Sequence, residues 1–448
     1  MTEPFGDIAG PDELRLLHRE YPDRYPFLLQ STATGSELGR YDILFAFPED
    51  ELCLGPDGVL AGHASERGQT FLDTLDEWWL ENRRSAPASN LPFHGGWFLY
   101  LGYELAGSIE PALDLHDDSL LPVAFAVRCP SAVIFDHEQS SAFLVSEGQD
   151  CADRETLLRD LESLQVVPAP TGIDFTSIRE EEPDCFIDAV VKAKEHIAAG
   201  DVYQANLSRE WEAGLGAGVD ASEIYASLCE ANPGPFAGMA RWDDVEIISS
   251  SPERLLKVRD GFASTRPIAG TRPRSHDDRT DNSLSTELFS HPKERAEHVM
   301  LVDLERNDLG RICEAGSVEV DEMMVLESYA HVHHIVSNVR GRIRPDVTPG
   351  QSIAAVFPGG TITGCPKVRC MEIIAALEQG PRGAYTGSFG YLNRDGSLDL
   401  NILIRTMVKR GDTVTFRAGS GIVADSDPHA ELQETRAKAE GLLRALTR

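Results

Sequence analysis

The chain has 448 residues, with 41 lysines and arginines against 73 aspartates and glutamates, so its formal net charge is −32. Hydrophobic residues make up 42% of the sequence, which is enough for a sizeable core and excludes a disordered chain. At about 100–200 residues per domain, this length predicts two or three domains or one large body. The acidity argues against nucleic acid and anionic membranes as partners, because both present negative phosphates.

The N-terminus and the cysteines indicate a cytoplasmic protein. Residues 1–7 contain neither the basic stretch nor the apolar stretch of a secretory signal. No apolar run approaches the ~18–20 residues needed to cross a bilayer. The eight cysteines are scattered and form no C-x-x-C pair, so we expect reduced and mostly buried thiols.

The hydrophobic pattern divides the chain into two regions. Between residues 26 and 145, short apolar runs alternate with Gly/Pro turns, as at 41–47, 96–101 and 142–145, which predicts strands. Residues 166–183 contain three prolines and an acidic cluster and are the predicted boundary, separating regions 1–165 and 184–448. The second region alternates predicted helices (184–199, 291–304, 367–377, 429–446) with predicted strands (246–250, 388–391, 399–408, 413–419). We therefore expect a mixed α/β fold with long-range strand pairing, in which both regions interweave in one compact body.

Two pairs of glutamates stand three residues apart in predicted helices: Glu294 with Glu297, and Glu431 with Glu434. Each pair presents two carboxylates on one face of its helix. Two such helices facing each other would hold a hard divalent cation such as Mg²⁺ through oxygen ligands and leave positions for a substrate. A solvated helix face has the same pattern, so the spacing alone leaves both interpretations open.

Glycine-rich segments at predicted strand ends favour a small anionic ligand. They span residues 267–274, 358–367 and 418–423, and glycine lets backbone N–H groups approach an anion closely. The second segment has part of a Walker A pattern, but it lacks the Gly-Lys-Ser/Thr ending that binds nucleotide phosphates. Arg405, in a predicted strand of mostly apolar residues, is either paired in the core or a clamp for a carboxylate.

The chain contains several distinctive sequence motifs, at 200–209 (GDVYQANLSR), 250–254 (SSPER), 293–298 (KERAEH), 303–311 (DLERNDLGR) and 419–434. With the glycine-rich segments, they resemble the chorismate-utilising enzymes, which comprise anthranilate synthase component I, aminodeoxychorismate synthase component I, isochorismate synthase and salicylate synthase. The similarity covers almost all of residues 184–445. Residues 27–31, 39–43 and 95–104 also resemble the family's N-terminal region. The resemblance implies a large two-layer sandwich of mostly antiparallel sheets with helices outside and the site in a cleft.

The resemblance also implies a magnesium site and a general acid. Glu297 and Glu434 match ligands of a Mg²⁺ ion that holds the ring carboxylate of chorismate, with Glu294 and Glu431 beside them. Glu253 matches the acid that protonates the departing 4-hydroxyl, and burial is expected to raise its pKa.

Further matches surround the substrate. His334 matches a histidine near the leaving oxygen, and Tyr385 and Arg405 match residues that bind the enolpyruvyl carboxylate. We interpret residues 303–311 as structural, a helix C-terminus tied by its polar side chains. The other matches that line the site are Gly270, Thr271, Thr361, Gly419, Gly421 and Lys438.

Gln204 separates the members of the family. It stands where the water-using members carry a lysine base, and an amide cannot take a proton from water. Ammonia is already a nucleophile and needs no base, so ammonia is the expected second substrate. The chain has no Gly-x-Cys-x-Gly elbow, and we therefore expect a separate glutamine amidotransferase subunit to supply the ammonia.

The residues conflict over the position of amination. Asn206, residues 40–43 and residues 357–367 resemble aminodeoxychorismate synthases, whereas Ala269 stands where those enzymes carry a lysine that adds to ring C2. We predict 4-amino-4-deoxychorismate for p-aminobenzoate and folate synthesis, with anthranilate formation as the alternative. A non-catalytic relative is disfavoured because the acid and all four glutamates are present. Residues 28–31 resemble a segment that lines a tryptophan pocket in anthranilate synthases, although an ordinary buried strand end explains them equally well.

Overall fold

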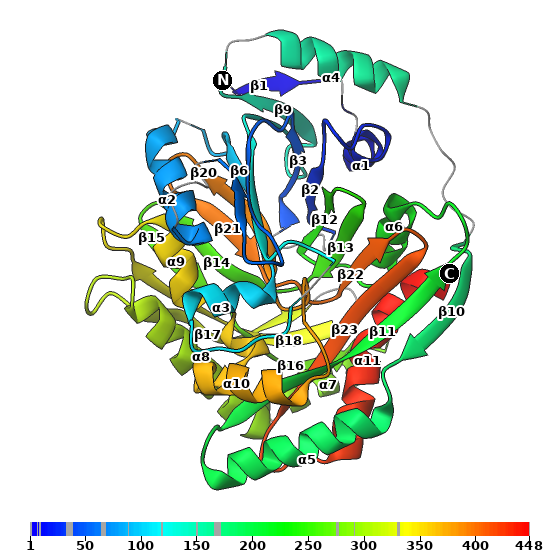
Figure 1. The fold of residues 1–448 in the computed structure, drawn as a ribbon, viewed down its shortest axis with the longest axis vertical. Coiled ribbons are helices and arrows are strands. Elements are labelled where there is room, and N and C mark those ends of the chain that lie inside the picture. Colours follow the sequence, from blue (N-terminus) through cyan, green and yellow to red (C-terminus); the bar gives the residue numbers. More distant parts are fainter. Residues whose placement is uncertain are drawn as a thin grey trace.

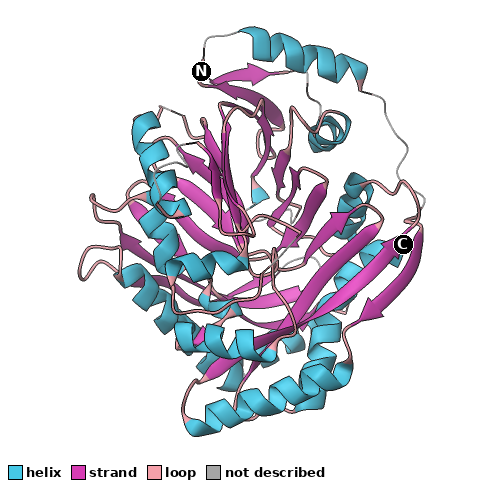
Figure 2. Cartoon of the chain, in the orientation of Figure 1, coloured by secondary structure: helices cyan, strands magenta, loops and turns pink. Residues whose placement is uncertain are grey.

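Two large antiparallel sheets form the body of the molecule and helices cover their outer faces (Figures 1 and 2). The computed structural model describes residues 2–6, 8, 10–32, 39–63, 69–87, 89–117, 120–148, 151–164, 172–274, 277–290, 292–328 and 332–447. Within these residues the sheets have 12 and 11 strands, and both combine strands from either side of residue 166. The predicted α/β fold class is confirmed.

The first sheet has the order β1 (Thr2–Phe5), β9 (Ser141–Ser146), β8 (Ser131–Asp136), β3 (Tyr41–Ala46), β2 (Phe27–Gln30), β12 (Phe236–Trp242), β13 (Val245–Ser251), β22 (Thr406–Arg410), β23 (Thr413–Ile422), β11 (Gln204–Leu215) and β10 (Phe175–Glu180), with β19 (Gly364–Cys365) paired to β11. The second has the order β16 (Ile268–Pro273), β18 (Val332–Arg342), β15 (Phe262–Thr265), β14 (Arg254–Arg259), β21 (Leu398–Asn401), β20 (Ser388–Asn393), β6 (Gly96–Leu101), β7 (Ala124–Cys129), β4 (Glu51–Leu54) and β5 (Leu60–Gly62), with β17 (Glu319–Ser328) paired to β18.

The structure has a helix at each of the four places predicted in the second region, 184–199, 291–304, 367–377 and 429–446. The described helices are α1 (Pro11–Glu20), α2 (Phe71–Asn82), α3 (Ala106–Ile109), α4 (Cys151–Ser163), α5 (Pro183–Ala199), α6 (Ala221–Ala231), α7 (Asp278–Ser290), α8 (Pro292–Gly310), α9 (Pro349–Val356), α10 (Lys367–Leu377) and α11 (Pro428–Thr447), with 3₁₀ turns η3 (Tyr103–Leu105) and η4 (Gly360–Ile362). None of the described helices is both long and apolar enough to cross a membrane. The seven cysteines whose side chains are described are free thiols, and of these only Cys185 is exposed.

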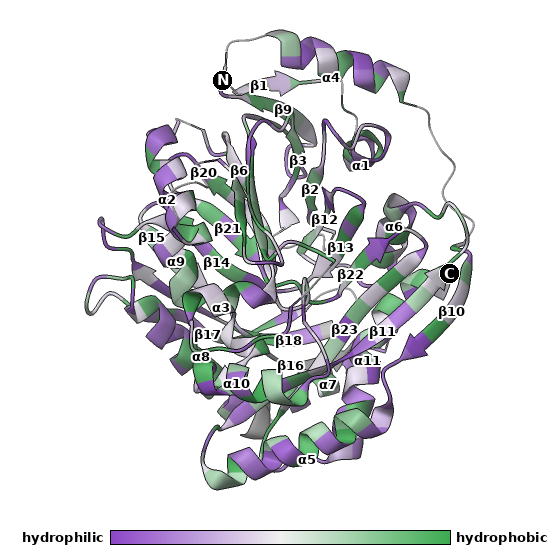
Figure 3. Cartoon of the chain, in the orientation of Figure 1, coloured by the Kyte–Doolittle hydropathy of each residue, from purple (hydrophilic) through white to green (hydrophobic). Residues whose placement is uncertain are grey.

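Helix α5 shows how local sequence sets these boundaries. It begins at Pro183, whose fixed φ suits a first helical turn, and ends at Gly200, which adopts a left-handed φ of +80°. Its sequence mixes hydrophobic and hydrophilic residues (Figure 3). The apolar face buries Phe186 and Val190 against β11 and neighbouring elements.

Aromatic rings join the two sheets in the centre of the molecule. Phe27 of β2 stacks on Phe98 of β6 with ring centroids 4.0 Å apart, and Trp242 of β12 stacks on Phe125 of β7 at 4.3 Å. Each pair links the first sheet to the second; the three phenylalanines are buried between them, and Trp242 is partly buried against them. Aromatic burial on this scale is a major contribution to the stability of the sandwich.

Residues 399–408 do not form one strand, and this prediction is wrong. The segment divides into β21 in the second sheet and β22 in the first, and the chain crosses between the sheets at residues 402–405. Ile402 and Leu403 are buried at this crossing, and Arg405 has a φ of +55° outside either strand. A short apolar run gives the same sequence signal whether it forms a strand or crosses a core, because its apolar side chains are buried in both cases. Part of the predicted boundary is also ordered structure, since residues 175–180 form β10 beside β11.

A buried ionic network holds β11 against the chain that precedes β20. Glu378 and Arg382 are paired at 2.7 Å, and the Arg382 guanidinium also donates to the carbonyls of Asn206 at 2.7 Å and Ile362 at 3.0 Å. Arg417 of β23 lies 3.4 Å from the same carboxylate. Burial alone would raise the pKa of Glu378, but the two arginines hold it below its usual value. The network therefore holds together β11, the turn at Ile362 and β23, three segments that contribute residues to the candidate site.

Replacing Arg382 should therefore destabilise the fold. Arg382→Leu leaves Glu378 short of its main partner and two carbonyls without their donor, so we expect a loss of about 3 kcal/mol in the free energy of unfolding. Urea titration followed by circular dichroism measures this loss. Arg369→Leu is the matched control, because Arg369 pairs with Glu372 and Asp201 at the surface and should change stability little. Equal effects of the two substitutions would contradict the structural role of the network.

Candidate active site

Two glycines of β23 make room for polar side chains of β11. Asn206 is paired with Gly421, and Ser208 with Gly419, in the antiparallel ladder. A Cβ atom on Gly421 would lie 2.5 Å from Nε2 of Gln204, and one on Gly419 would lie 2.8 Å from both Oδ1 of Asn206 and Oη of Tyr385. Only glycine permits this approach, so the predicted residues Gln204, Gly419, Gly421 and Tyr385 converge.

The two amides on β11 present unpaired acceptors. Oε1 of Gln204 and Oδ1 of Asn206 are buried and have no hydrogen-bond partner within the described part of the chain. Buried amide oxygens are normally hydrogen-bonded, so unpaired ones at a glycine-lined position indicate a ligand that brings N–H or O–H donors.

Helix α11 carries charge to the same place. Lys438 donates to the carbonyl of Gly419 at 3.0 Å and pairs with Glu434 at 2.7 Å. One turn earlier, Glu431 is buried, and its Oε2 atom has no partner among the described residues. The helix thus directs an amine and two carboxylates toward the end of β23.

Arg405 faces several of these groups and forms no ion pair within 4 Å among the residues that the structure describes. Burial lowers its pKa, whereas Tyr385, Glu434 and Glu253 raise it. A largely buried guanidinium without a carboxylate partner is suited to bind an anionic ligand bidentately. Of the two interpretations of Arg405, the geometry favours the carboxylate clamp over the paired core residue.

Among the acids of the site, Glu253 has a pKa that is shifted far above its ordinary value. It lies between β13 and β14, its side chain is buried, and its Oε1 atom has no hydrogen-bond partner in the described structure. Burial raises its pKa to about 8, and Glu305 acts in the same direction, while the Thr361 hydroxyl and Lys438 act against it. The burial and raised pKa expected of this residue are therefore present, and the carboxyl keeps its proton at neutral pH.

His334 and Gly270 lie on the paired strands β18 and β16. His334 is buried, and burial followed by the charge of Arg405 lowers its pKa to about 4, although a backbone hydrogen bond with Gly270 raises it. The imidazole is therefore neutral at physiological pH and can accept or donate a hydrogen bond. Thr271 pairs with His334 in the ladder, but the position of its side chain lies outside the described residues, as does that of Ala269.

The glutamate pairs are placed on two helices, as predicted. Glu431 and Glu434 are on α11 and Glu297 is on α8, while the side chain of Glu294 lies outside the described residues. Within the described side chains, no group of three His, Cys, Asp or Glu residues is arranged to hold a metal ion. The unpaired oxygen of Glu431 and the all-carboxylate donor set nevertheless fit a hard cation such as Mg²⁺.

Comparison with known proteins agrees with this geometry. A family model described as chorismate binding enzyme matches residues 25–444. The chain belongs to the chorismate binding enzyme family. It is therefore a chorismate-utilising enzyme, and the recognition made from its sequence blocks is confirmed.

The similar proteins include more than one activity within this family. An anthranilate synthase component I-like protein of Synechocystis is 45% identical, with 80% of this chain and 74% of that protein covered. The aminodeoxychorismate synthase component 1 of Bacillus subtilis is 40% identical, with 91% of this chain and 89% of that protein covered. The crystal structure of anthranilate synthase component I from Streptococcus pneumoniae has a TM-score of 0.80 and 34% identity, and covers 91% of this chain and 93% of its own.

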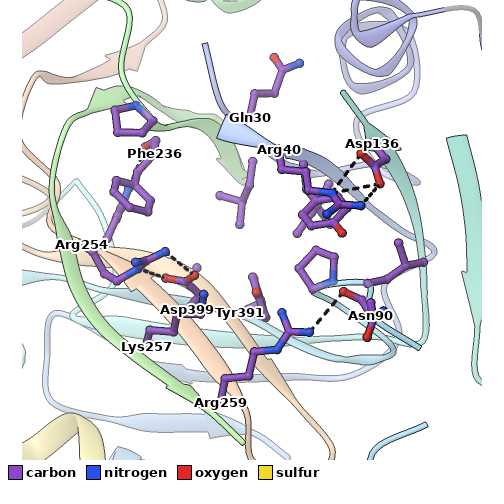
Figure 4. A pocket seen from close by; sticks show the side chains of 18 of the residues that line it. Gln30, Arg40, Asn90, Asp136, Phe236, Arg254, Lys257, Arg259, Tyr391 and Asp399 are labelled. Atoms are coloured by element: carbon purple, nitrogen blue, oxygen red, sulfur yellow. Dashed lines mark hydrogen bonds and ion pairs between the residues drawn. The ribbon is translucent and has the colours of Figure 1, made fainter. Parts of the chain in front are cut away.

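A separate cavity of about 600 Å³ lies beside β2 (Figure 4). Its wall includes Gln30, Arg40 and Lys257, and Figure 4 shows the Arg254–Asp399 and Arg40–Asp136 pairs at its rim. Of residues 28–31, interpreted either as a tryptophan-pocket segment or as a buried strand end, Leu29 and Gln30 of β2 line this cavity. A cavity is present there in this member of the family.

One buried acid of the site region escaped the sequence analysis. Glu305 is buried on α8, and its Oε1 atom would lie 3.2 Å from a Cβ on Gly360, next to Thr361. It belongs to the charged block 303–311, which reads as a helix end and gives no sign of burial. The block does end a helix, since α8 stops at Gly310, and Asp308 ties it to Lys367.

The raised pKa of Glu253 predicts a pH limit on turnover. The acid donates only when protonated, so the rate per concentration of NH₃ should be constant below pH 8 and fall as the pH rises through about 8. Glu253→Gln should reduce turnover roughly a hundredfold or more while leaving chorismate binding intact. Steady-state rates from pH 6.5 to 9.5 and equilibrium binding measure the two effects. Full activity of the variant would exclude the general-acid role.

Proposed function

We propose that this enzyme aminates chorismate at C4, giving 4-amino-4-deoxychorismate for p-aminobenzoate and folate synthesis. The observation that carries the proposal is the buried, protonated Glu253 in one site with the unpaired Arg405 and the unpaired amides of β11. An acid that keeps its proton at neutral pH can release a poor leaving group such as hydroxyl. Gln204, in place of a basic residue, suits a nucleophile that needs no activation.

The residues divide the reaction between them. Arg405 and Tyr385 hold the enolpyruvyl carboxylate, and Lys438 and the glycines of β23 shape the floor. Glu253 transfers its proton to the 4-oxygen as the C4–O bond breaks, and water leaves. Ammonia, held by the amide oxygens of Gln204 and Asn206, supplies the new C–N bond. Chorismate and ammonia are thus converted to the amino product and water. The neutral His334 steadies the departing oxygen by a hydrogen bond.

A magnesium ion fits the acidic side of this site. Glu297, Glu434, Glu431 and Glu294 would hold it, and the ion would supply positive charge for the ring carboxylate of chorismate. The ammonia is proposed to come from a separate glutamine amidotransferase, as the name component 1 of the Bacillus subtilis relative supports.

Anthranilate formation is the second candidate, and Ala269 favours it. Without a lysine at this position, the covalent route through ring C2 is closed, and ammonia could itself add at C2. The similarity to anthranilate synthase component I of Streptococcus pneumoniae is compatible with that outcome. Asn206 and residues 357–367 support the 4-amino product.

Product analysis distinguishes the two functions. The purified chain is incubated with chorismate, Mg²⁺ and ammonium at alkaline pH, and products are separated and identified by mass. We expect a product with the mass of aminodeoxychorismate that added lyase converts to p-aminobenzoate. A fluorescent anthranilate product that forms without a lyase would establish the second candidate instead. An Ala269→Lys variant tests whether the lysine alone redirects the amine.

The proposed metal site predicts a coupled loss of activity and magnesium response. Glu434→Ala removes a ligand and frees Lys438, so we expect turnover to fall by roughly a hundredfold and Mg²⁺ to stop stimulating what remains. Titration of activity with Mg²⁺, and calorimetry of Mg²⁺ binding, measure these effects. Glu440→Ala is the control, because Glu440 pairs with Arg444 on the exposed face of the same helix. An unchanged magnesium response in the first variant would place these glutamates on an ordinary solvated surface.

A further inference from the structure

A cluster of two carboxyls and one amine is buried behind the proposed acid. Glu305 and Asp308 of α8 are 6% and 3% exposed. Lys367, at the start of α10, donates to Oδ2 of Asp308 at 2.6 Å and to the carbonyl of Val356 at 2.8 Å. The reaction assigned to the site above uses none of these three groups.

The charges of this cluster favour one retained proton. Lys367 is paired with Asp308 and Arg311 also acts on that carboxyl, so an ionised Glu305 would leave a negative charge without an ion-pair partner among the described residues, which a low-dielectric interior strongly disfavours. Asp308 holds the direct pair with Lys367, so Glu305 is the group that keeps the proton. Burial and the neighbouring Asp308 both raise the pKa of Glu305, while Lys367, Thr265 and the N–H of Gly360 act against them. Glu305 is therefore poised to release and regain a proton near neutral pH.

Glu305 and Glu253 flank the same short turn. The Glu305 carboxyl lies against Gly360, and the Glu253 carboxyl lies against the next residue, Thr361. The hydroxyl of Thr361 is buried beside Glu253, on whose pKa it acts, and a hydroxyl can accept one proton while it donates another. The charge of Glu305 is among the influences that raise the pKa of Glu253.

The opposite end of the cluster reaches a groove. Asp308 and Lys367 line a depression of about 810 Å³ together with Asn307, Arg311 and the exposed ring of Tyr203. The groove is separate from the glycine-lined floor where chorismate is proposed to bind. The cluster thus connects the acid with solvent on a side that the substrate does not cover.

We propose that Glu305 returns a proton to Glu253 after each turnover, taking it from the groove through Asp308 and Lys367. The proposal rests on the general-acid role of Glu253. When the C4–O bond breaks, the Glu253 proton leaves with the departing water and a carboxylate remains. That carboxylate takes the Glu305 proton through the Thr361 hydroxyl, and Glu305 takes one from water at the Asp308–Lys367 pair. No other reactant is consumed, and the proton taken up from solvent is balanced by the product amine, which forms from NH₃ as –NH₃⁺.

A purely structural role makes a different kinetic prediction. The Asp308–Lys367 pair ties α8 to α10, and a packing role for Glu305 would affect binding and every turnover alike. A relay is needed only from the second turnover onward, because the enzyme starts with Glu253 protonated. Comparing the first turnover with later ones therefore separates the two roles.

The test uses Glu305→Gln, which keeps the size of the side chain but cannot donate a carboxyl proton. In rapid-mixing assays at pH 7.5, we expect the first turnover to match the parent and the steady-state rate to fall roughly tenfold to a hundredfold. Glu305→Asp should recover part of the steady-state rate. Glu314→Gln is the matched control, an acid-to-amide change at an exposed glutamate beyond the end of α8 that pairs with Arg342 and should leave both phases unchanged.

A second readout does not depend on activity. Carboxyl infrared titration of the protein, with the Glu253 band assigned by Glu253→Gln, should show Glu253 ionising at lower pH in Glu305→Gln than in the parent, because a raising influence is removed. Equal losses in both kinetic phases, an unchanged steady-state rate, or an unshifted Glu253 titration would each overturn the relay. If the Glu253→Gln variant turned over chorismate at the parent rate, the proposed general acid would be contradicted, and the relay with it.

Discussion

A carboxyl group buried between two sheets must either meet a cation or keep its proton, and in this structure Glu253 keeps its proton. Its place is fixed by the backbone, since its carbonyl accepts a hydrogen bond from the N–H of Ile402 at 3.0 Å where the chain crosses between the sheets. Lys438 acts on it, but Lys438 is already paired with Glu434. The site is therefore organised around an acid whose protonation is set by burial, and the Arg405 guanidinium near it remains available for a ligand.

The crossing at residues 402–405 makes this arrangement possible. It brings Arg405 out of the strand ladder at a φ of +55°, so its side chain serves neither sheet. The Arg382 network secures the surroundings, because one guanidinium holds the carbonyls of Asn206 and Ile362 and the hydroxyl of Thr386. The segments carrying Gln204, Thr361 and Tyr385 are thus fixed by a single buried charge. A fully buried arginine is costly in isolation, and Glu378 offsets that cost.

Local signals in the sequence were enough to predict most of the helices. Helix α10 has the predicted bounds and follows Pro366, and α5 differs by one residue, because Pro183 and Gly200 set its ends. The prediction of one strand at 399–408 was wrong, because apolar continuity does not show that the chain changes sheet. The glycines at 419 and 421 could be assigned to a site, but the side chains that approach them, Gln204 and Asn206, come from a strand some 200 residues away, and only the pairing of β11 with β23 reveals the contact. Glu305 could not be identified, since a glutamate among other charges reads as surface, and its burial depends on the turn at Gly360.

The net charge of −32 sets a problem for an enzyme whose proposed substrate is a dicarboxylate. Long-range attraction cannot bring such a substrate in, because the field of the whole surface opposes it and is only partly screened by salt. Binding then depends on charges at contact distance, where Arg405 and Lys438 act within a buried site of reduced dielectric. A neutral Glu253 matters here as well as in proton transfer, because an ionised carboxylate at this place would offset the charge of Arg405. Keeping the acid protonated therefore serves substrate binding and bond cleavage through the same physical cause, its burial.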